Sequence, residues 1–181
     1  MDNNQNILGF DSADNRFSST NVVANADGSM IERQEYMQSI NGGVVQKALT
    51  TTANGNTTIF NYTGAIEILS IVGRVTTIME TKTQNTKLAI VSDALTAVDI
   101  CANVDLTAAA VGTLLSITGT AANAMVASTN GALAPGQANK VIATCTTSGI
   151  IRQIVGAANT GAITWSVIWK PLSPGATLTA A

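Results

Sequence analysis

The pattern of apolar and polar positions changes at Val44, and from there to the end of the chain it follows the period of β-strands. Apolar residues recur at every second position in short runs, as expected for strands with one buried face. Turn-forming residues such as Pro135-Gly136 and Ser148-Gly149 separate the runs. This layout predicts an all-β fold, with a β-sandwich or jelly-roll body over residues 44–181. The runs cover residues 49–52, 57–60, 65–77, 87–91, 98–106, 114–118, 124–127, 140–146, 150–155 and 162–169.

Two glycine positions give more specific expectations inside this region. Asn54-Gly55 lies between the runs 49–52 and 57–60, and an Asn-Gly pair between β-branched residues is typical of a β-hairpin turn. Gly73 interrupts the alternation of residues 65–77 and predicts a bulge or bend at that point.

The two cysteines, Cys101 and Cys145, lie in apolar, strand-like runs. The alternation of residues 98–106 places Cys101 on the face opposite Ile100, whereas that of residues 141–145 points Cys145 inward. Free cysteine is among the most buried residue types, so we expect two buried apolar thiols with no disulfide between them.

Residues 29–43 carry the best helix pattern of the chain. Ser29 can cap a helix, Glu32 three residues later completes a capping box, and Asn41-Gly42-Gly43 would end it. We therefore predict a short helix and linker over residues 29–43, ahead of the β body.

Three residues of this predicted helix, Met30, Gln34 and Met37, follow the spacing of a coiled-coil seam. They are therefore candidates for an oligomer interface. So short a seam is explained equally well by a helix that packs on the body, and both interpretations stay open.

The first 28 residues are rich in Asn, Asp and Ser, and their apolar residues are too scattered to form a core. Such a segment is either a disordered tail or an extended N-terminal arm that becomes ordered against a partner. We favour the arm, because a tail in solvent does not need Phe10, Phe17, Val22 and Val23. These four residues are the candidate partner contacts.

Trp165 and Trp169 lie on one face of the last apolar run, together with Val167. The simplest interpretation is that both tryptophans belong to the core. A subunit interface is the alternative, because tryptophan is enriched at the centre of protein interfaces. Trp165 and Trp169 are therefore also candidates for an oligomer interface.

Composition favours a subunit that is covered by its neighbours. Charged residues make up 11% of the chain, where about 25% is typical, and Thr, Ala, Asn and Ser replace them. The net charge of −2 gives no electrostatic case for nucleic acid. Residues 1–9 lack the features of a signal peptide, and no apolar run reaches the roughly 18 to 20 residues that span a bilayer. We therefore expect a soluble protein with no membrane partner.

Candidate chemistry is scarce in the sequence. The chain has no histidine, so the commonest general base and nitrogen metal ligand are missing. Asp99 and Asp105 share a predicted strand face, but six residues of strand separate them by roughly 20 Å. We therefore expect a non-enzymatic protein with no catalytic residues, no cofactor and no metal site.

Three short stretches resemble structural proteins of tailed bacteriophages. Residues 26–38 (ADGSMIERQEYMQ) are similar to a helical phrase of such proteins. Residues 112–120 (GTLLSITGT) and 169–176 (WKPLSPGA) are similar to parts of virion β-domains. The helical phrase usually has an apolar residue where Gln34 stands. The resemblance implies a trimeric protein of the particle surface, such as a capsid decoration (cement) protein, a head fibre or part of a tail.

Our first expectation is a decoration protein that binds and stabilises the capsid shell as a homotrimer. Its partners would be further copies of itself and the major capsid protein or another virion protein. Phe10, Phe17, Val22 and Val23 would then contact the capsid. The protein would be made in the bacterial cytoplasm and would lie on the outer capsid surface of the virion. The alternative is a head-fibre or tail-fibre adhesin that binds a host-surface receptor.

Overall fold

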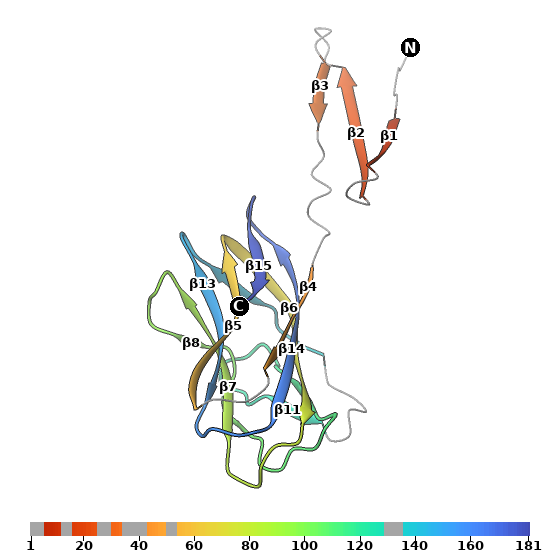
Figure 1. Cartoon of the computed structure of the whole chain (residues 1–181). Helices are drawn as coiled ribbons and strands as arrows, with labels where there is room; N and C mark the ends of the chain where they lie inside the picture. Colours follow the sequence, from red (N-terminus) through yellow and green to blue (C-terminus); the bar gives the residue numbers. More distant parts are fainter. Residues whose placement is uncertain (1–5, 12–15, 25–29, 34–42, 50–53, 129–135) are drawn as a thin grey trace. The chain divides into compact units, whose positions relative to one another are not determined.

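The regular elements of the computed structural model are all β-strands within the residues it describes, which are 6–11, 16–24, 30–33, 43–49, 54–128 and 136–181. The chain divides into two compact units, Met1–Asn41 and Gly42–Ala181, and Figure 1 shows the strands of each. The expected all-β fold is therefore confirmed. The described residues contain no helix that is long and apolar enough to cross a membrane.

The N-terminal unit contains a three-stranded antiparallel sheet in the order β1-β2-β3. Its strands are β1 (Asn6–Asp11), β2 (Arg16–Ala24) and β3 (Met30–Arg33). In the β1–β2 pair, Phe10 lies opposite Phe17. The segment predicted as an arm therefore contains strands that pair with one another.

The predicted helix over residues 29–43 is wrong at its start, because Met30–Arg33 form strand β3. The rest of that helix, including Gln34 and Met37, lies outside the described residues. A helix of about three turns is marginal on its own. Pairing with β2, in which Ile31 lies opposite Val23, instead satisfies the backbone of these residues through a neighbouring strand.

The second unit consists of two six-stranded antiparallel sheets. In the first, called the β6 sheet, the order is β11-β10-β6-β14-β4, and β12 pairs with β6 beside β10. Its strands are β4 (Val44–Leu49), β6 (Ala65–Thr77), β10 (Leu114–Ser116), β11 (Val126–Ser128), β12 (Val141–Thr144) and β14 (Ala162–Pro171).

In the second, called the β13 sheet, the order is β15-β5-β13-β7-β8, and β9 also pairs with β7. Its strands are β5 (Gly55–Thr63), β7 (Asn85–Ser92), β8 (Val98–Asp99), β9 (Val104–Asp105), β13 (Gly149–Val155) and β15 (Thr177–Ala180). The buried apolar side chains of both sheets form one core. The arrangement is that of a β-sandwich.

The predicted hairpin around Asn54-Gly55 is wrong. Strand β4 pairs with β14 and strand β5 pairs with β13, so the two neighbouring strands belong to different sheets. Residues 50–53, which connect them, lie outside the described residues. A local turn signal does not determine strand pairing when each of the two strands pairs along its length with a strand that is distant in the sequence.

Gly73 does not form the predicted bulge. It pairs directly with Trp165 in the β6–β14 ladder, and the register shifts of that ladder lie elsewhere. A Cβ atom at position 73 would lie 2.7 Å from the Trp165 ring. Glycine is therefore required here for close packing of the indole on the β6 backbone.

The predicted strand over residues 98–106 is interrupted. Within this segment only the short strands β8 and β9 are formed, each of which pairs with β7, and the chain bends between them. Because of this bend Ile100 and Cys101 are both buried, so the predicted separation of these two side chains onto opposite faces is wrong. Burial of Cys101 confirms the expected apolar role of this thiol, and it raises the pKa of Cys101 to about 11. Cys145 is only half-buried, and both cysteines are free.

Candidate interaction surface

The outer face of the β6 sheet is formed by side chains that alternate with the core residues of β4, β6, β12 and β14. Ser70, Ile168 and Val44 lie side by side on β6, β14 and β4, and Ile142 lies opposite Glu67 on the neighbouring strand β12. The side chains of Val44 and Ile142 are each 63% exposed and that of Ile168 is 42% exposed. The face therefore carries three aliphatic residues in contact with solvent.

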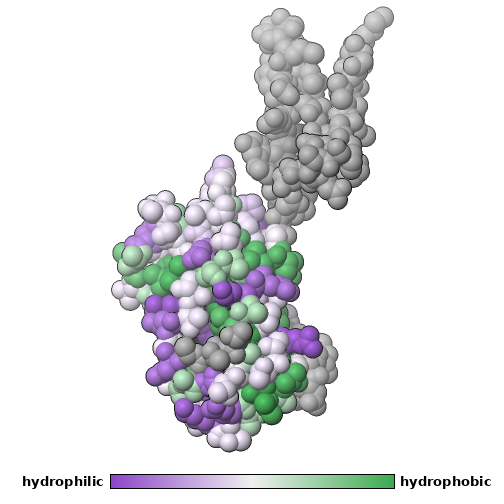
Figure 2. Space-filling view, in the orientation of Figure 1, coloured by the Kyte–Doolittle hydropathy of each residue, from purple (hydrophilic) through white to green (hydrophobic). Residues whose placement is uncertain are grey.

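Most other side chains on this face are small or uncharged. Val72, Ser166 and Gln46 form the next row across the sheet. Figure 2 shows, for the viewed side of the sandwich, that apolar residues (green) reach the surface in separate patches, with pale and strongly hydrophilic (purple) residues between them. Small hydroxyl and aliphatic side chains lose little entropy on burial, so such a surface is suited to contact with another protein.

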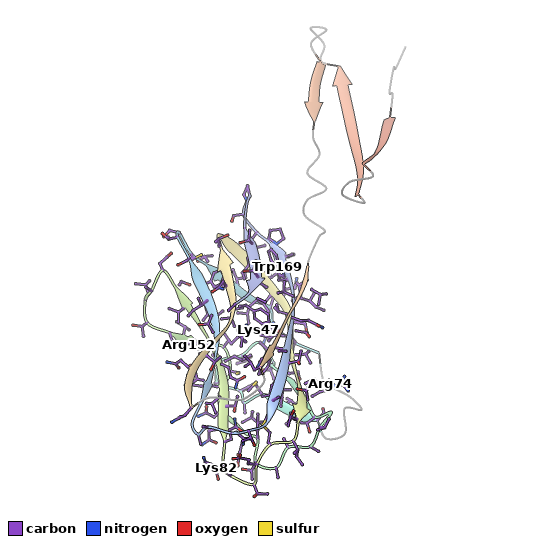
Figure 3. All side chains as sticks on the ribbon, in the orientation of Figure 1. Lys47, Arg74, Lys82, Arg152 and Trp169 are labelled. Atoms are coloured by element: carbon purple, nitrogen blue, oxygen red, sulfur yellow. The ribbon has the colours of Figure 1, made fainter. Side chains whose placement is uncertain are left out.

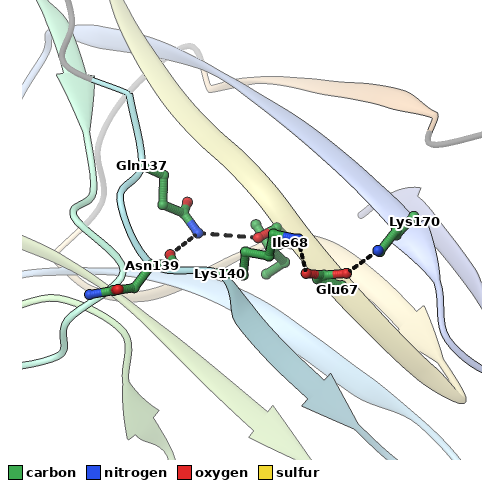
Figure 4. Close-up of polar contacts among 6 residues, drawn as sticks. All are labelled: Glu67, Ile68, Gln137, Asn139, Lys140 and Lys170. Atoms are coloured by element: carbon green, nitrogen blue, oxygen red, sulfur yellow. Dashed lines mark hydrogen bonds and ion pairs between the residues drawn. The ribbon is translucent and has the colours of Figure 1, made fainter.

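A carboxylate held by two lysines lies on this face. Glu67 Oε1 is 3.1 Å from Lys140 Nζ, and Glu67 Oε2 is 2.6 Å from Lys170 Nζ. Figure 4 shows Lys140 and Lys170 approaching the carboxylate from opposite sides. The hydrogen bond from Lys170, followed by that from Lys140, lowers the pKa of Glu67. Glu67 is therefore charged at neutral pH, and it offsets the charge of one of the two lysines.

Gln137 holds the segment before β12 against β6. Its Nε2 donates to the backbone oxygen of Ile68 at 3.1 Å and to that of Asn139 at 2.7 Å (Figure 4). These bonds fix the chain just ahead of Lys140. The position of Lys140 beside Glu67 is thus set by backbone contacts as well as by the ion pair.

The cations of the sandwich are spread over its surface. Figure 3 shows Arg74 and Arg152 on opposite sides of the unit and Lys82 at one end. Arg74 lies on the same face as Glu67, opposite Thr164 of β14. Among the residues that the structure describes, that face therefore carries the cations of Arg74, Lys140 and Lys170 and the carboxylate of Glu67, so it is mildly basic.

Asp93 anchors the loop between β12 and β13. Its carboxylate accepts hydrogen bonds from the backbone N–H groups of Thr146, Thr147 and Ser148, at distances between 2.7 and 3.3 Å. These bonds lower the pKa of Asp93 to about 2, and the bond from the Thr146 N–H makes the largest contribution. The Asp93 backbone has φ = 50°, a left-handed conformation that Asp and Asn adopt more readily than most residues.

Replacing Asp93 with Asn should reduce stability at neutral pH and weaken its dependence on acid. The pKa of Asp93 is lower in the folded chain than its usual value of 3.8. The charged carboxylate therefore stabilises the fold above about pH 4, and that contribution is lost as pH falls towards 2. Asn keeps the backbone preference but not the charge. Denaturant unfolding of both proteins at several pH values should show their stability difference shrinking below pH 4. A difference that stays constant with pH would contradict this role.

The structure places most of the residues that the sequence proposed for binding in the sheet of the N-terminal unit. Phe10, Val22 and Val23 lie on strands β1 and β2 of the N-terminal unit, as does Phe17. Met30 begins β3 instead of a helix. The described residues contain no group of three or more His, Cys, Asp or Glu side chains that could hold a metal ion.

The two tryptophans are core residues, which corrects their proposed place in an oligomer interface. Trp165 is completely buried and Trp169 is 9% exposed. Both point inward from β14, as does Val167 between them, while Ile168 points out. The sequence analysis did not single out Ile168, because it considered only the strand positions that are expected to be buried. The residues that alternate with them, including Ile168, are the ones that reach the surface.

Comparisons with known proteins identify no family. No protein-family model matches the chain, and no curated protein matches it. A solved structure described as "Structure of infectious bursal disease virus Gx strain" shares a low structural likeness, with a TM-score of 0.32 and 9% sequence identity. The match covers 90% of this chain and 44% of the other, so this chain spans less than half the length of that one. At this TM-score the likeness establishes nothing about function.

Proposed function

We propose that the chain is a non-enzymatic structural protein of a virus particle. In the more specific form of this proposal, it is a homotrimeric decoration protein that binds the outer capsid surface and stabilises it. The observation that best supports a binding role is the outer face of the β6 sheet, where Val44, Ile142 and Ile168 are exposed on a face that carries few charged residues. The resemblance of residues 26–38, 112–120 and 169–176 to bacteriophage structural proteins points to the particle.

The division of the chain into two units supports the same role. A decoration protein needs a body that covers the shell and benefits from a second contact, because linked contacts raise each other's effective concentration. The sandwich provides such a body. The N-terminal unit, with six acidic and two basic residues among residues 1–43, would provide the second contact on a basic or neutral part of the shell.

The first test uses particles that lack the protein. Ile168→Asp should weaken co-sedimentation with such particles by about tenfold or more, because a charge buried at an interface without a partner is costly. Leu95→Asp is the matched control, since Leu95 is 69% exposed and lies outside the β6 sheet. Equal binding by both variants would exclude the outer face of the β6 sheet as the contact.

The same assay tests the N-terminal unit. Phe10→Ala and Phe17→Ala should each weaken binding by on the order of 2 kcal/mol, the typical loss when an aromatic anchor is truncated. A chain shortened to residues 42–181 should lose binding while keeping a β-type circular dichroism spectrum. Undiminished binding by the shortened chain would reject the contact by this unit. Full binding without a gain in the heat resistance of the particles would instead favour a fibre adhesin, which needs a mount but does not reinforce the shell.

A further inference from the structure

Among the described residues, the β6 sheet extends one strand less beyond β6 at β12 than it does at β10. Strand β6 pairs along one side with β10 at residues 72–74 and with β12 at residues 65–68. Strand β11 lies outside β10 and pairs with it. Within the described residues, no strand lies outside β12. The sheet therefore ends one strand earlier at β12 than it does at β10.

The backbone of β12 can accept another strand. The Cys145 N–H donates to the Gly64 oxygen at 3.0 Å, which continues the β12–β6 ladder by one residue. In an antiparallel ladder every second residue directs its N–H and C=O to the same neighbour. Val141 and Ala143 therefore face β6, and Ile142 and Thr144 present their backbone groups at the outer edge. This is the edge geometry to which an extended peptide adds.

A hollow of about 400 Å³ lies beside this edge, and this volume is within the range of peptide and small-molecule sites, about 300–1,000 Å³. It opens between β12 of one sheet and β8 of the other. Apolar residues make up much of its lining, namely Ile90, Val98, Ile100, Val141, Ile142 and Ala143. The inward side chains of an added strand would enter this space.

The charges at the rim of the hollow are already paired. Lys140 binds Glu67, and Asp99 forms a 2.6 Å ion pair with Lys87. A ligand in the hollow therefore does not have to supply a charge. An uncharged segment matches both the neutralised rim and the apolar wall.

The opposite edge of the β6 sheet, formed by β4, differs from β12. Edge strand β4 carries Lys47 in its middle, and Lys47 Nζ donates to the backbone oxygen of Ala181 just after β15. A lysine on an edge strand is a common protection against strand addition. Residues Val141–Thr144 of β12 contain no charged residue.

We propose that β12 and the adjoining hollow bind an extended, uncharged segment of a different protein, with apolar side chains at alternate positions. The segment adds to β12 as a strand, and its inward side chains fill the hollow. Pairing of β12 with the β12 of a second copy would not fill it, because Val141 and Ala143 of each copy already face their own core. This inference uses only the sandwich and does not depend on a role in a virus particle.

The probe is a short peptide in which valine and threonine alternate, with one lysine at each end for solubility. Added to the full-length ¹⁵N-labelled protein, it should bind saturably and shift the amide resonances of Ile142 and Thr144. It should also slow hydrogen exchange at these two amides, which the added strand would protect. The same peptide with N-methylated amides along one edge should not bind. Absence of saturable binding by the unmethylated peptide at millimolar concentration would overturn the proposal.

Two pairs of variants separate strand addition from nonspecific contact. Thr144→Pro removes an outward N–H without breaking the ladder to β6, so affinity should fall about three- to tenfold, whereas Thr144→Ala should change it less than twofold. Ala121 lines the hollow and its exposed neighbour Ala122 does not. Ala121→Trp should therefore block the peptide, and Ala122→Trp should not. Equal effects within either pair, or self-association of the chain that displaces the peptide, would count against the proposed occupant.

Discussion

Gly149→Ala should destabilise the sandwich by about 3 kcal/mol, the upper part of the usual range for overpacking a core. Gly149 lies at the start of β13, directly opposite Tyr62 of β5 and Ser92 of β7. The Tyr62 ring covers it so closely that a Cβ atom at position 149 would lie 2.0 Å from Tyr62 Cζ. No unstrained arrangement of the present neighbours accommodates that atom.

The Tyr62 ring cannot easily move away. It is almost fully buried in the core, and its hydroxyl group lies 2.6 Å from Ser92 Oγ, on the strand beyond Gly149. Burial also raises the pKa of the Tyr62 phenol. A displaced ring would lose both its packing and its hydrogen bond. For a domain of this size, a loss of about 3 kcal/mol lowers Tm by roughly 10 °C.

Gly156→Ala is the matched control, because Gly156 directly follows the same strand. The nearest atom to a Cβ at position 156 would be the Asn85 backbone oxygen at 3.6 Å, which is an ordinary contact. The free energy of unfolding of the Gly156→Ala protein should therefore differ from that of the unchanged protein by less than about 1 kcal/mol. Calorimetry or denaturant unfolding of both variants checks the pair. A Gly149→Ala protein as stable as the Gly156→Ala protein would contradict the packing of Tyr62 on Gly149.

The strands could largely be predicted from the sequence because one face of each is buried. Residues 65–77 were expected as a strand and form β6 with those same bounds, and the runs at 150–155 and 162–169 lie within β13 and β14. In β13 the buried residues alternate along the whole strand. Burial of one face leaves a two-residue period in the sequence, and this period is a local signal.

Strand pairing could not be predicted in the same way, because it depends on contacts between distant segments. The Asn54-Gly55 pair predicts a hairpin, yet β4 pairs with β14, more than a hundred residues later in the chain. The helix pattern of residues 29–43 failed for a similar reason. Capping residues favour a helix in an isolated segment. In the folded chain Met30–Arg33 instead pair with β2, and the local sequence pattern carries no information about that partner strand.

The candidate surface could also be predicted only in part from the sequence. Ile168 and Val44 are exposed, but the sequence around each residue does not indicate that they lie side by side on neighbouring strands. Glu67 and its two lysines come from three separate strands or loops. The low charge of the chain predicted a surface suited to contact. The position of that surface required the sheet order.

The second large effect should follow from Trp165→Phe, which should cost about 3 kcal/mol. Trp165 Nε1 donates a 2.7 Å hydrogen bond to Gln153 Oε1, and both side chains are completely buried. Within the described residues, Gln153 Nε2 has no hydrogen-bond partner. Without the indole N–H, the whole Gln153 amide would be buried unpaired, which costs about 1–3 kcal/mol. The smaller ring would add about 1–2 kcal/mol through lost packing beside Gly73.

A second substitution distinguishes the hydrogen bond from the packing. Gln153→Leu removes the buried amide, so Trp165→Phe should be less damaging in that background by at least about 1 kcal/mol. The measured quantity is the coupling free energy of the double-mutant cycle from denaturant unfolding. Additive effects would show that the bond between the two sheets contributes little.

Protein concentration separates this core role from the oligomer interface that the sequence also suggested. A tryptophan buried within one subunit affects the stability of that subunit directly, so the change in Tm caused by Trp165→Phe should be the same at low and high protein concentration. An interface residue would give a loss that shrinks as concentration rises, because mass action restores the assembly. Ile168→Ser is the contrasting variant, since Ile168 is the outward neighbour of Val167 on the same strand. It should leave the unfolding of the isolated chain nearly unchanged. A concentration-dependent loss for Trp165→Phe would reject the core assignment.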